Sequence, residues 1–95
     1  MLLGDVIAEF DDPTVAAETL VSLDDLSLLA KVQAAAAEEE LSAGEFAVQA
    51  VDRFVALASD EDWVTLFGVL ARAADPGRTF LRRVLMAALE EPAPA

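Results

Sequence analysis

Carboxylates and arginines are the side chains through which this sequence could act chemically. The chain has eighteen acids and no His, Cys, Tyr or Asn. It therefore lacks the commonest general base, the thiol nucleophile and most transition-metal ligands. We expect no catalytic residue, no metal and no cofactor. Two charged groups stand out, one basic and one acidic, and both are candidate partner contacts: Arg72, Arg78, Arg82 and Arg83; Glu38, Glu39 and Glu40.

The four arginines fall within twelve positions, and Arg78 and Arg82 are spaced to share one helix face. They could form ion pairs with the acidic remainder of the chain. Alternatively, they could bind an anionic partner or the acidic half of a second copy. Arg rather than Lys fills all four positions, and Arg forms bidentate pairs with carboxylates. The acidic run 38–40 is the nearest candidate partner, within one copy or between two.

The acidic run 38–40 ends an alanine-rich stretch, where a helix terminus carries partial negative charge and favours Lys or Arg. It is either a solvated helix end or an acidic docking patch. The acids of Asp60-Glu-Asp62 do not continue as a calcium loop, so we read them as a first helical turn. Lys31 is interpreted as a surface lysine rather than a nucleophile. Trp63, the only tryptophan, is either core packing or a further partner contact.

The charge is divided unevenly along the chain. Residues 1–62 hold fifteen acids and two basic residues, a net of −13, and residues 63–95 hold three acids and four arginines, a net of +1. Together they give the net charge of −12. Such a chain is repelled by phosphate backbones, so nucleic acid is not an expected partner. Because 56% of the residues are hydrophobic, we expect exposed apolar surface and a homo-oligomer, a dimer or larger.

No segment predicts a membrane partner. The longest run without a charge is nine residues, 63–71, against the roughly twenty that a membrane span needs. Asp5 and Glu9 interrupt the apolar N-terminal stretch, which lacks the basic start of a signal peptide. We therefore expect a cytoplasmic protein.

Helix starts can be recognised at five places. A serine is followed three residues later by an acid in 22–25, 42–45 and 59–62, as in a capping box. Asp12-Pro13 and Asp75-Pro76 each place a capping acid before a proline at the first helical position. Gly68 would lie inside a helix, where it allows a close helix–helix approach or is merely tolerated.

Apolar spacing near 3.6 residues indicates helices over 3–10, 13–21, 24–39 and 43–58, with two more striped from Trp63 to Ala74 and from Phe80 to Leu89. The apolar stripes of these helices, which should face the core, include Val21, Leu26, Phe54, Leu57, Phe67 and Ala88. The predicted fold is all-α: a compact bundle of five to six short helices in a single domain, 1–91. The Pro/Ala tail 92–95 is expected to be disordered.

The stretch Leu20-Val-Ser-Leu-Asp-Asp, followed by an expected helix, the turn Leu41-Ser-Ala-Gly-Glu-Phe46 and a second helix, resembles the ribbon-helix-helix family over residues 20–58. The resemblance implies that 20–23 is a strand that pairs between two chains and reads a DNA groove. The sequence departs from the family there, because only Ser22 among 20–23 is polar. The secondary structure of Thr19–Leu23 distinguishes the two interpretations of the fold: a helix there indicates an all-α bundle, and a strand indicates a ribbon-helix-helix protein.

These observations favour a non-enzymatic protein that acts through protein–protein interaction, regulatory or adaptor-like, with a protein partner that the sequence does not identify. The alternative is a ribbon-helix-helix-like dimeric regulator associated with DNA.

Overall fold

A computed structural model of the chain describes residues 3–90. This part of the chain forms six helices and no strand: α1 (Leu3–Glu9), α2 (Pro13–Ser22), α3 (Leu26–Glu38), α4 (Ala43–Leu57), α5 (Asp60–Ala71) and α6 (Pro76–Glu90). The predicted all-α fold is confirmed. The predicted Pro/Ala tail 92–95 lies outside the described residues.

Four of the five predicted helix starts are correct. Ser42 and Glu45 exchange backbone-to-side-chain hydrogen bonds of 2.9 and 3.1 Å, and Ser59 forms the same capping box with Asp62. Asp12 and Asp75 each accept a hydrogen bond from a backbone N–H of the following turn. These contacts satisfy N–H groups that have no partner inside their helix.

The predicted start at Ser22 is wrong, because this serine ends α2. Its hydroxyl donates to the carbonyl of Thr19, and Asp24 then reverses the chain with a φ of 54°. Asp25 caps α3 by accepting from the Leu28 N–H at 3.0 Å. A serine hydroxyl can bond backward within a helix as readily as it caps the next one, so the pattern alone was ambiguous. Residues 19–22 are helical, which answers the question left open at Thr19–Leu23.

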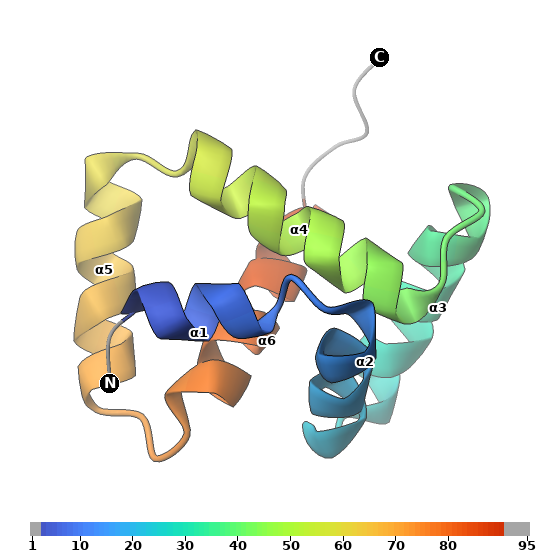
Figure 1. The fold of residues 1–95 in the computed structure, drawn as a ribbon, viewed down its shortest axis with the longest axis horizontal. Helices are drawn as coiled ribbons and strands as arrows, with labels where there is room; N and C mark the ends of the chain where they lie inside the picture. The colour runs from blue at the N-terminus through green and yellow to red at the C-terminus, as the bar shows by residue number, and fades with distance from the viewer. Residues whose placement is uncertain (1–2, 91–95) are drawn as a thin grey trace.

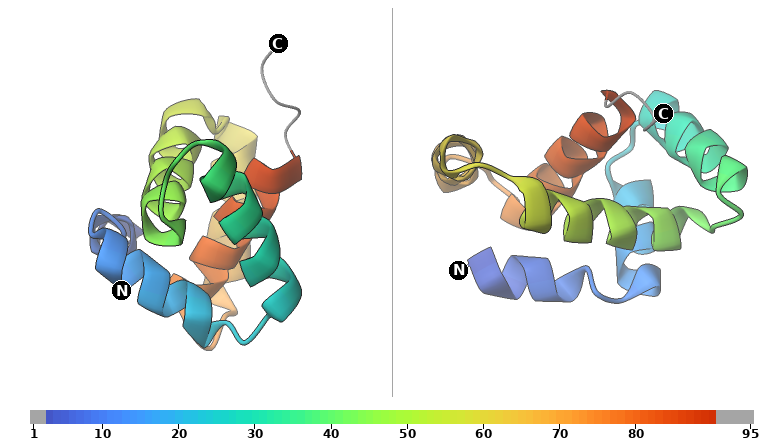
Figure 2. Two further views of the ribbon diagram at one scale, coloured as in Figure 1. Left: turned by 90° about the vertical axis from the view of Figure 1, so that its right-hand side faces the viewer. Right: turned by 90° about the horizontal axis from the view of Figure 1, so that it is seen from above.

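The helices pack in an irregular bundle around α4 and α6 (Figure 1). Helix α4 packs most extensively against α2 and also contacts α3 and α6. Helix α6 passes behind α1 and contacts every other helix. Helix α5 stands at one edge of the molecule and α3 at the opposite edge, as both Figures 1 and 2 show.

The core takes residues from all six helices. Its fully buried large side chains are Phe10, Phe80, Leu20, Leu66, Leu81, Leu85, Val6, Val32, Val51 and Val84. Four residues expected on core-facing stripes are instead exposed: Val21, Leu26, Leu57 and Phe67. Leu26 is the first residue of α3, so the core-facing row of that helix is Leu28, Val32 and Ala36. The other three are more than half exposed within the part of the chain that the structure describes.

Two glycines have opposite surroundings. A Cβ on Gly44 would lie 2.2 Å from the carbonyl oxygen of Pro13, so glycine permits the close contact of α2 with α4. A Cβ on Gly68 would have no atom within 4 Å. The close helix–helix approach considered for Gly68 is therefore not made within residues 3–90.

Candidate functional site

Arg78 and Arg82 hold the turn between α2 and α3. Arg78 Nη2 donates to the carbonyl oxygen of Ser22, and Arg82 Nη2 donates to the carbonyl oxygen of Leu23 at 3.3 Å. Arg82 Nη1 also forms an ion pair with Asp25 Oδ2 at 2.8 Å. The two carbonyls belong to the end of α2, where partial negative charge favours a cation.

Asp25 therefore serves two purposes, as the cap of α3 and as the ion-pair partner of Arg82. The hydrogen bond from the Leu28 N–H, followed by that from Arg82, lowers the pKa of Asp25. Both bonds favour the charged carboxylate, and they outweigh the opposing effect of partial desolvation. The first of the expected roles of the arginines, an ion pair with the chain's own acids, is thus found at Arg82.

The four arginines do not form one patch. Arg83 is exposed and lies on a different side of α6 from Arg78 and Arg82. Arg72 is exposed at the end of α5, where it occupies the C-cap position. Residues that are close in sequence are separated because Arg72 precedes the α5–α6 turn and because Arg82 and Arg83 are about 100° apart around one helix.

The acidic residues 38–40 are all exposed, at the end of α3. Asp25 is at the other end of this helix, about 20 Å away at 1.5 Å per residue. Among residues 3–90, no ion pair joins the acidic run to an arginine, so the pairing expected within one chain is not formed. The reason is that α6 crosses the start of α3 rather than its end.

The turn after α3 has the hydrogen bonds of a Schellman motif. Leu41 N–H donates to the Ala36 carbonyl at 2.9 Å, and Glu40 N–H donates to that of Ala37 at 3.1 Å. Glu40 has a φ of 59°, the left-handed conformation that such a turn usually assigns to glycine. The acidic run therefore departs from two local preferences, in charge and in backbone conformation.

Trp63 is half-buried and belongs to a chain of aromatic rings. Its ring centroid lies 5.5 Å from that of Phe54 and 6.4 Å from that of Phe67. Phe54 in turn contacts Phe80, which stacks on Phe10 in the core. Trp63 thus has the packing role considered for it, and its rings connect the core to the exposed Phe67.

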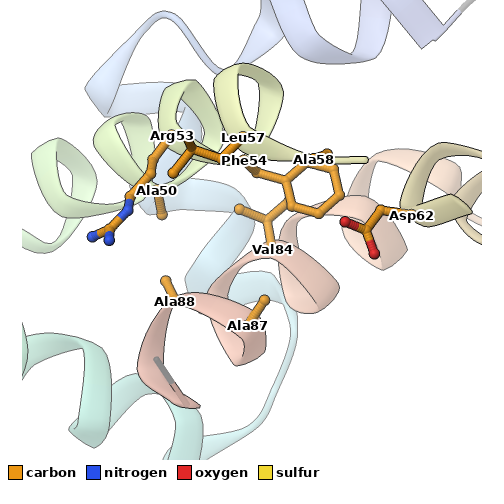
Figure 3. A pocket seen from close by; sticks show the side chains of 9 residues that line it. All are labelled: Ala50, Arg53, Phe54, Leu57, Ala58, Asp62, Val84, Ala87 and Ala88. Carbon is orange, nitrogen blue, oxygen red and sulfur yellow. The ribbon is translucent and has the colours of Figure 1, made fainter. Parts of the chain in front are cut away.

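A surface groove lies between α4, the start of α5 and α6 (Figure 3). We call it the α4–α6 groove. Its volume is about 170 Å³, and its lining is mostly apolar: Ala50, Arg53, Phe54, Leu57, Ala58, Asp62, Val84, Ala87 and Ala88. In Figure 3 the apolar side chains of α4 and α6 face each other across the groove, with Asp62 at one end.

A second, more polar hollow of about 360 Å³ continues the groove along α6. It shares Phe54, Asp62 and Ala87 with the first and adds Glu61, Thr65, Arg83, Met86 and Glu90. The result is an apolar strip with charges of both signs at its rim. Two large apolar side chains are exposed on the strip, Leu57 at 67% and Met86 at 46%.

Sequence reasoning found Arg83 but not the groove around it. Phe54, Leu57 and Ala88 lie on the predicted apolar stripes and all line the groove; Phe54 and Ala88 also pack against the core, whereas Leu57 is exposed. The adjacent alanines Ala87 and Ala88 were a sequence signal for the groove. Two small side chains in the apolar stripe of a helix leave space opposite a larger side chain. Only the placement of α4 against α6 shows that this space opens to solvent.

Among residues 3–90, no polar or charged residue is buried, and no three carboxylates come together as a metal site. No helix of residues 3–90 combines the length and the apolar character that crossing a membrane requires. Comparisons with protein-family models, curated proteins and solved structures find no match for the chain.

Proposed function

We propose that this chain is a non-enzymatic protein-interaction module, regulatory or adaptor-like, which binds a segment of another protein in the α4–α6 groove. The observation that carries the proposal is the groove itself, an apolar hollow next to the exposed Leu57 and Met86. Exposed apolar surface beside a concave strip is typical of protein-binding sites.

The size of the groove limits what it would accept. A cavity of about 150 Å³ holds a molecule such as benzene, so about 170 Å³ suits one large apolar side chain. Arg83 on one side, and Glu61 and Asp62 on the other, would orient the flanking residues of the partner. Charged rims of this kind add specificity more than affinity. The expected ligand is a peptide segment with one Leu, Met or aromatic anchor and charges beside it.

A random peptide library displayed on phage tests the proposal with the purified chain as target. Selected peptides should share an apolar anchor, and Ala87→Arg, which fills the groove, should weaken their binding by more than tenfold. Leu57→Glu should weaken it as well. Leu26→Glu is the matched control, because Leu26 is 78% exposed and lies on α3, away from the groove.

The result that would overturn the proposal is equal binding of every selected peptide to all three variants, with circular dichroism showing that each is folded. Failure to select any peptide with an apolar anchor would also count against it.

The resemblance to the ribbon-helix-helix family leaves the DNA-associated dimer as the alternative, and no described contact favours it. Residues 19–22 are helical in the single chain, and the guanidinium groups of Arg78 and Arg82 are engaged with the α2–α3 turn. A mobility-shift assay with random duplex DNA at physiological salt should show no complex. Sub-micromolar binding that weakens with added salt would favour the alternative.

A further inference from the structure

The outer face of α5 is apolar and uncovered. Val64 is 69% exposed and Phe67 is 53% exposed, and Gly68 and Ala71 beside them are exposed too. The spacing of these four residues, i, i+3, i+4 and i+7, places them on one side of the helix. We call this set the α5 stripe. It lies on the side of α5 away from Asp62 and Thr65, which line the hollow beside α6.

Helix α5 is more apolar than its burial requires. Leu66 is its only fully buried residue, and α6 is the helix against which it mainly packs. After its acidic first turn, α5 has only one polar residue, Thr65, between Trp63 and Ala71, and so apolar a stretch normally buries most of its surface. Helix α5 lies at the edge of the molecule (Figures 1 and 2), and within residues 3–90 the four residues of the stripe stay exposed.

The shape of the stripe suits a copy of itself. Gly68 leaves an opening, since a Cβ there would meet no atom within 4 Å, and Val64 projects one turn before it. In an antiparallel pair of α5 helices that is centred near Leu66, Val64 of each copy lies opposite Gly68 of the other. A two-fold interface requires this kind of self-complementary surface.

The charges at the two ends of α5 select the same arrangement. Asp60 is at the start of the helix, and Arg72 is at its end, about 18 Å away, so the two cannot pair within one chain. In the antiparallel pair each Arg72 faces the Asp60 of the other copy. A parallel pair would place like charges together at both ends. The opposed helix dipoles also favour the antiparallel pair.

We propose that the α5 stripe is the interface of a homodimer, in which two α5 helices pack antiparallel with Val64 against Gly68 and Arg72 against Asp60. This surface is separate from the α4–α6 groove, so the dimer does not depend on the function proposed above. It assigns the fourth arginine, Arg72, to a contact between copies.

Sedimentation velocity from 5 to 500 µM in 0.15 M salt tests the dimer. The parent should change from monomer to dimer in this range, and Val64→Lys should raise the dissociation constant by at least about tenfold, because it buries an unpaired charge at the centre of the interface. Leu26→Lys, at an exposed apolar site on α3, is the control and should leave the dissociation constant unchanged.

Charge reversal tests the orientation. Arg72→Glu alone and Asp60→Lys alone should each weaken the dimer, and the double variant should recover it, because the pair is restored in reversed form. A parent that stays monomeric at 500 µM overturns the proposal, as does a dimer that Val64→Lys leaves unchanged. A dimer that Val64→Lys weakens but the double charge reversal does not restore overturns the antiparallel arrangement. Ala87→Arg should not affect dimerisation, so failure of the groove and failure of the dimer are distinguishable.

Discussion

Gly44→Ala should destabilise the protein, although alanine is the better helix former. The new Cβ would lie 2.2 Å from the Pro13 carbonyl oxygen, 3.0 Å from its carbon and 3.3 Å from the Ala17 Cβ. A normal separation from the oxygen is roughly 1 Å longer, and the obstacle is backbone that cannot rotate away. Helices α2 and α4 must therefore move apart by that amount along the most extensive helix contact in the chain.

A gap of 0.5 to 1 Å forfeits about a quarter to a half of the dispersion energy of the contacts that it opens. Overpacking of this kind typically costs about 1–3 kcal/mol. We expect a loss of about 2 kcal/mol, since the position in the first turn of α4 gains little from helix propensity. For a domain of this length, such a loss lowers Tm by roughly 8–16 °C.

Urea unfolding followed by circular dichroism at low micromolar concentration measures this loss, with Gly68→Ala as the matched control. Gly68 is an exposed glycine inside a helix with open space around it, so alanine there should add up to about 1 kcal/mol. The two identical substitutions should thus change stability in opposite directions. A Gly44→Ala variant as stable as the parent would refute the close α2–α4 contact.

Three further changes test other parts of the structure. Glu40→Gly should stabilise the chain by about 0.5–1 kcal/mol in urea unfolding, because glycine adopts the left-handed backbone conformation at this position without strain. Glu39→Gly should not stabilise the chain, because Glu39 has an ordinary φ of −102°. Because the pKa of Asp25 is lowered on folding, its charge stabilises the fold above the ordinary pKa of 3.8, and this contribution disappears as the pH falls through the folded value. The stability advantage of the parent over Asp25→Asn at pH 7 should therefore shrink as the pH falls below 3.8, and a constant difference would contradict the hydrogen bonds from the Leu28 N–H and Arg82 to this carboxylate. Phe80→Ala should cost about 3–5 kcal/mol by thermal unfolding, and a loss under 1 kcal/mol would be inconsistent with a fully buried ring.

Local patterns predicted the helices well because helix ends are decided within a few residues. The Ser42 and Ser59 capping boxes depend only on a hydroxyl and an acid three positions apart, and both are formed. The start at Ser22 failed because two local hydrogen bonds compete there, one backward to Thr19 and one forward into the next helix. Only the φ of Asp24 shows which one the chain adopts.

The contacts between helices could not be predicted from one chain read in order, because side-chain spacing specifies a helix face but not its neighbour. Arg82 was expected to form an ion pair with an acidic residue of the chain. Its partner is Asp25 rather than the acidic run 38–40, because α6 crosses the start of α3. Leu57 and Phe67 were assigned to the core by their spacing, and both are exposed.

The sequence by itself determined that the chain is helical, where most of its helices begin and that it has no histidine or cysteine, because each of these depends on composition or on contacts within one turn. The tertiary structure decided which apolar stripes are covered and which remain open. That outcome depends on the angles at which α5 and α6 pack relative to α4. Packing across the whole molecule sets these angles, and no single residue does.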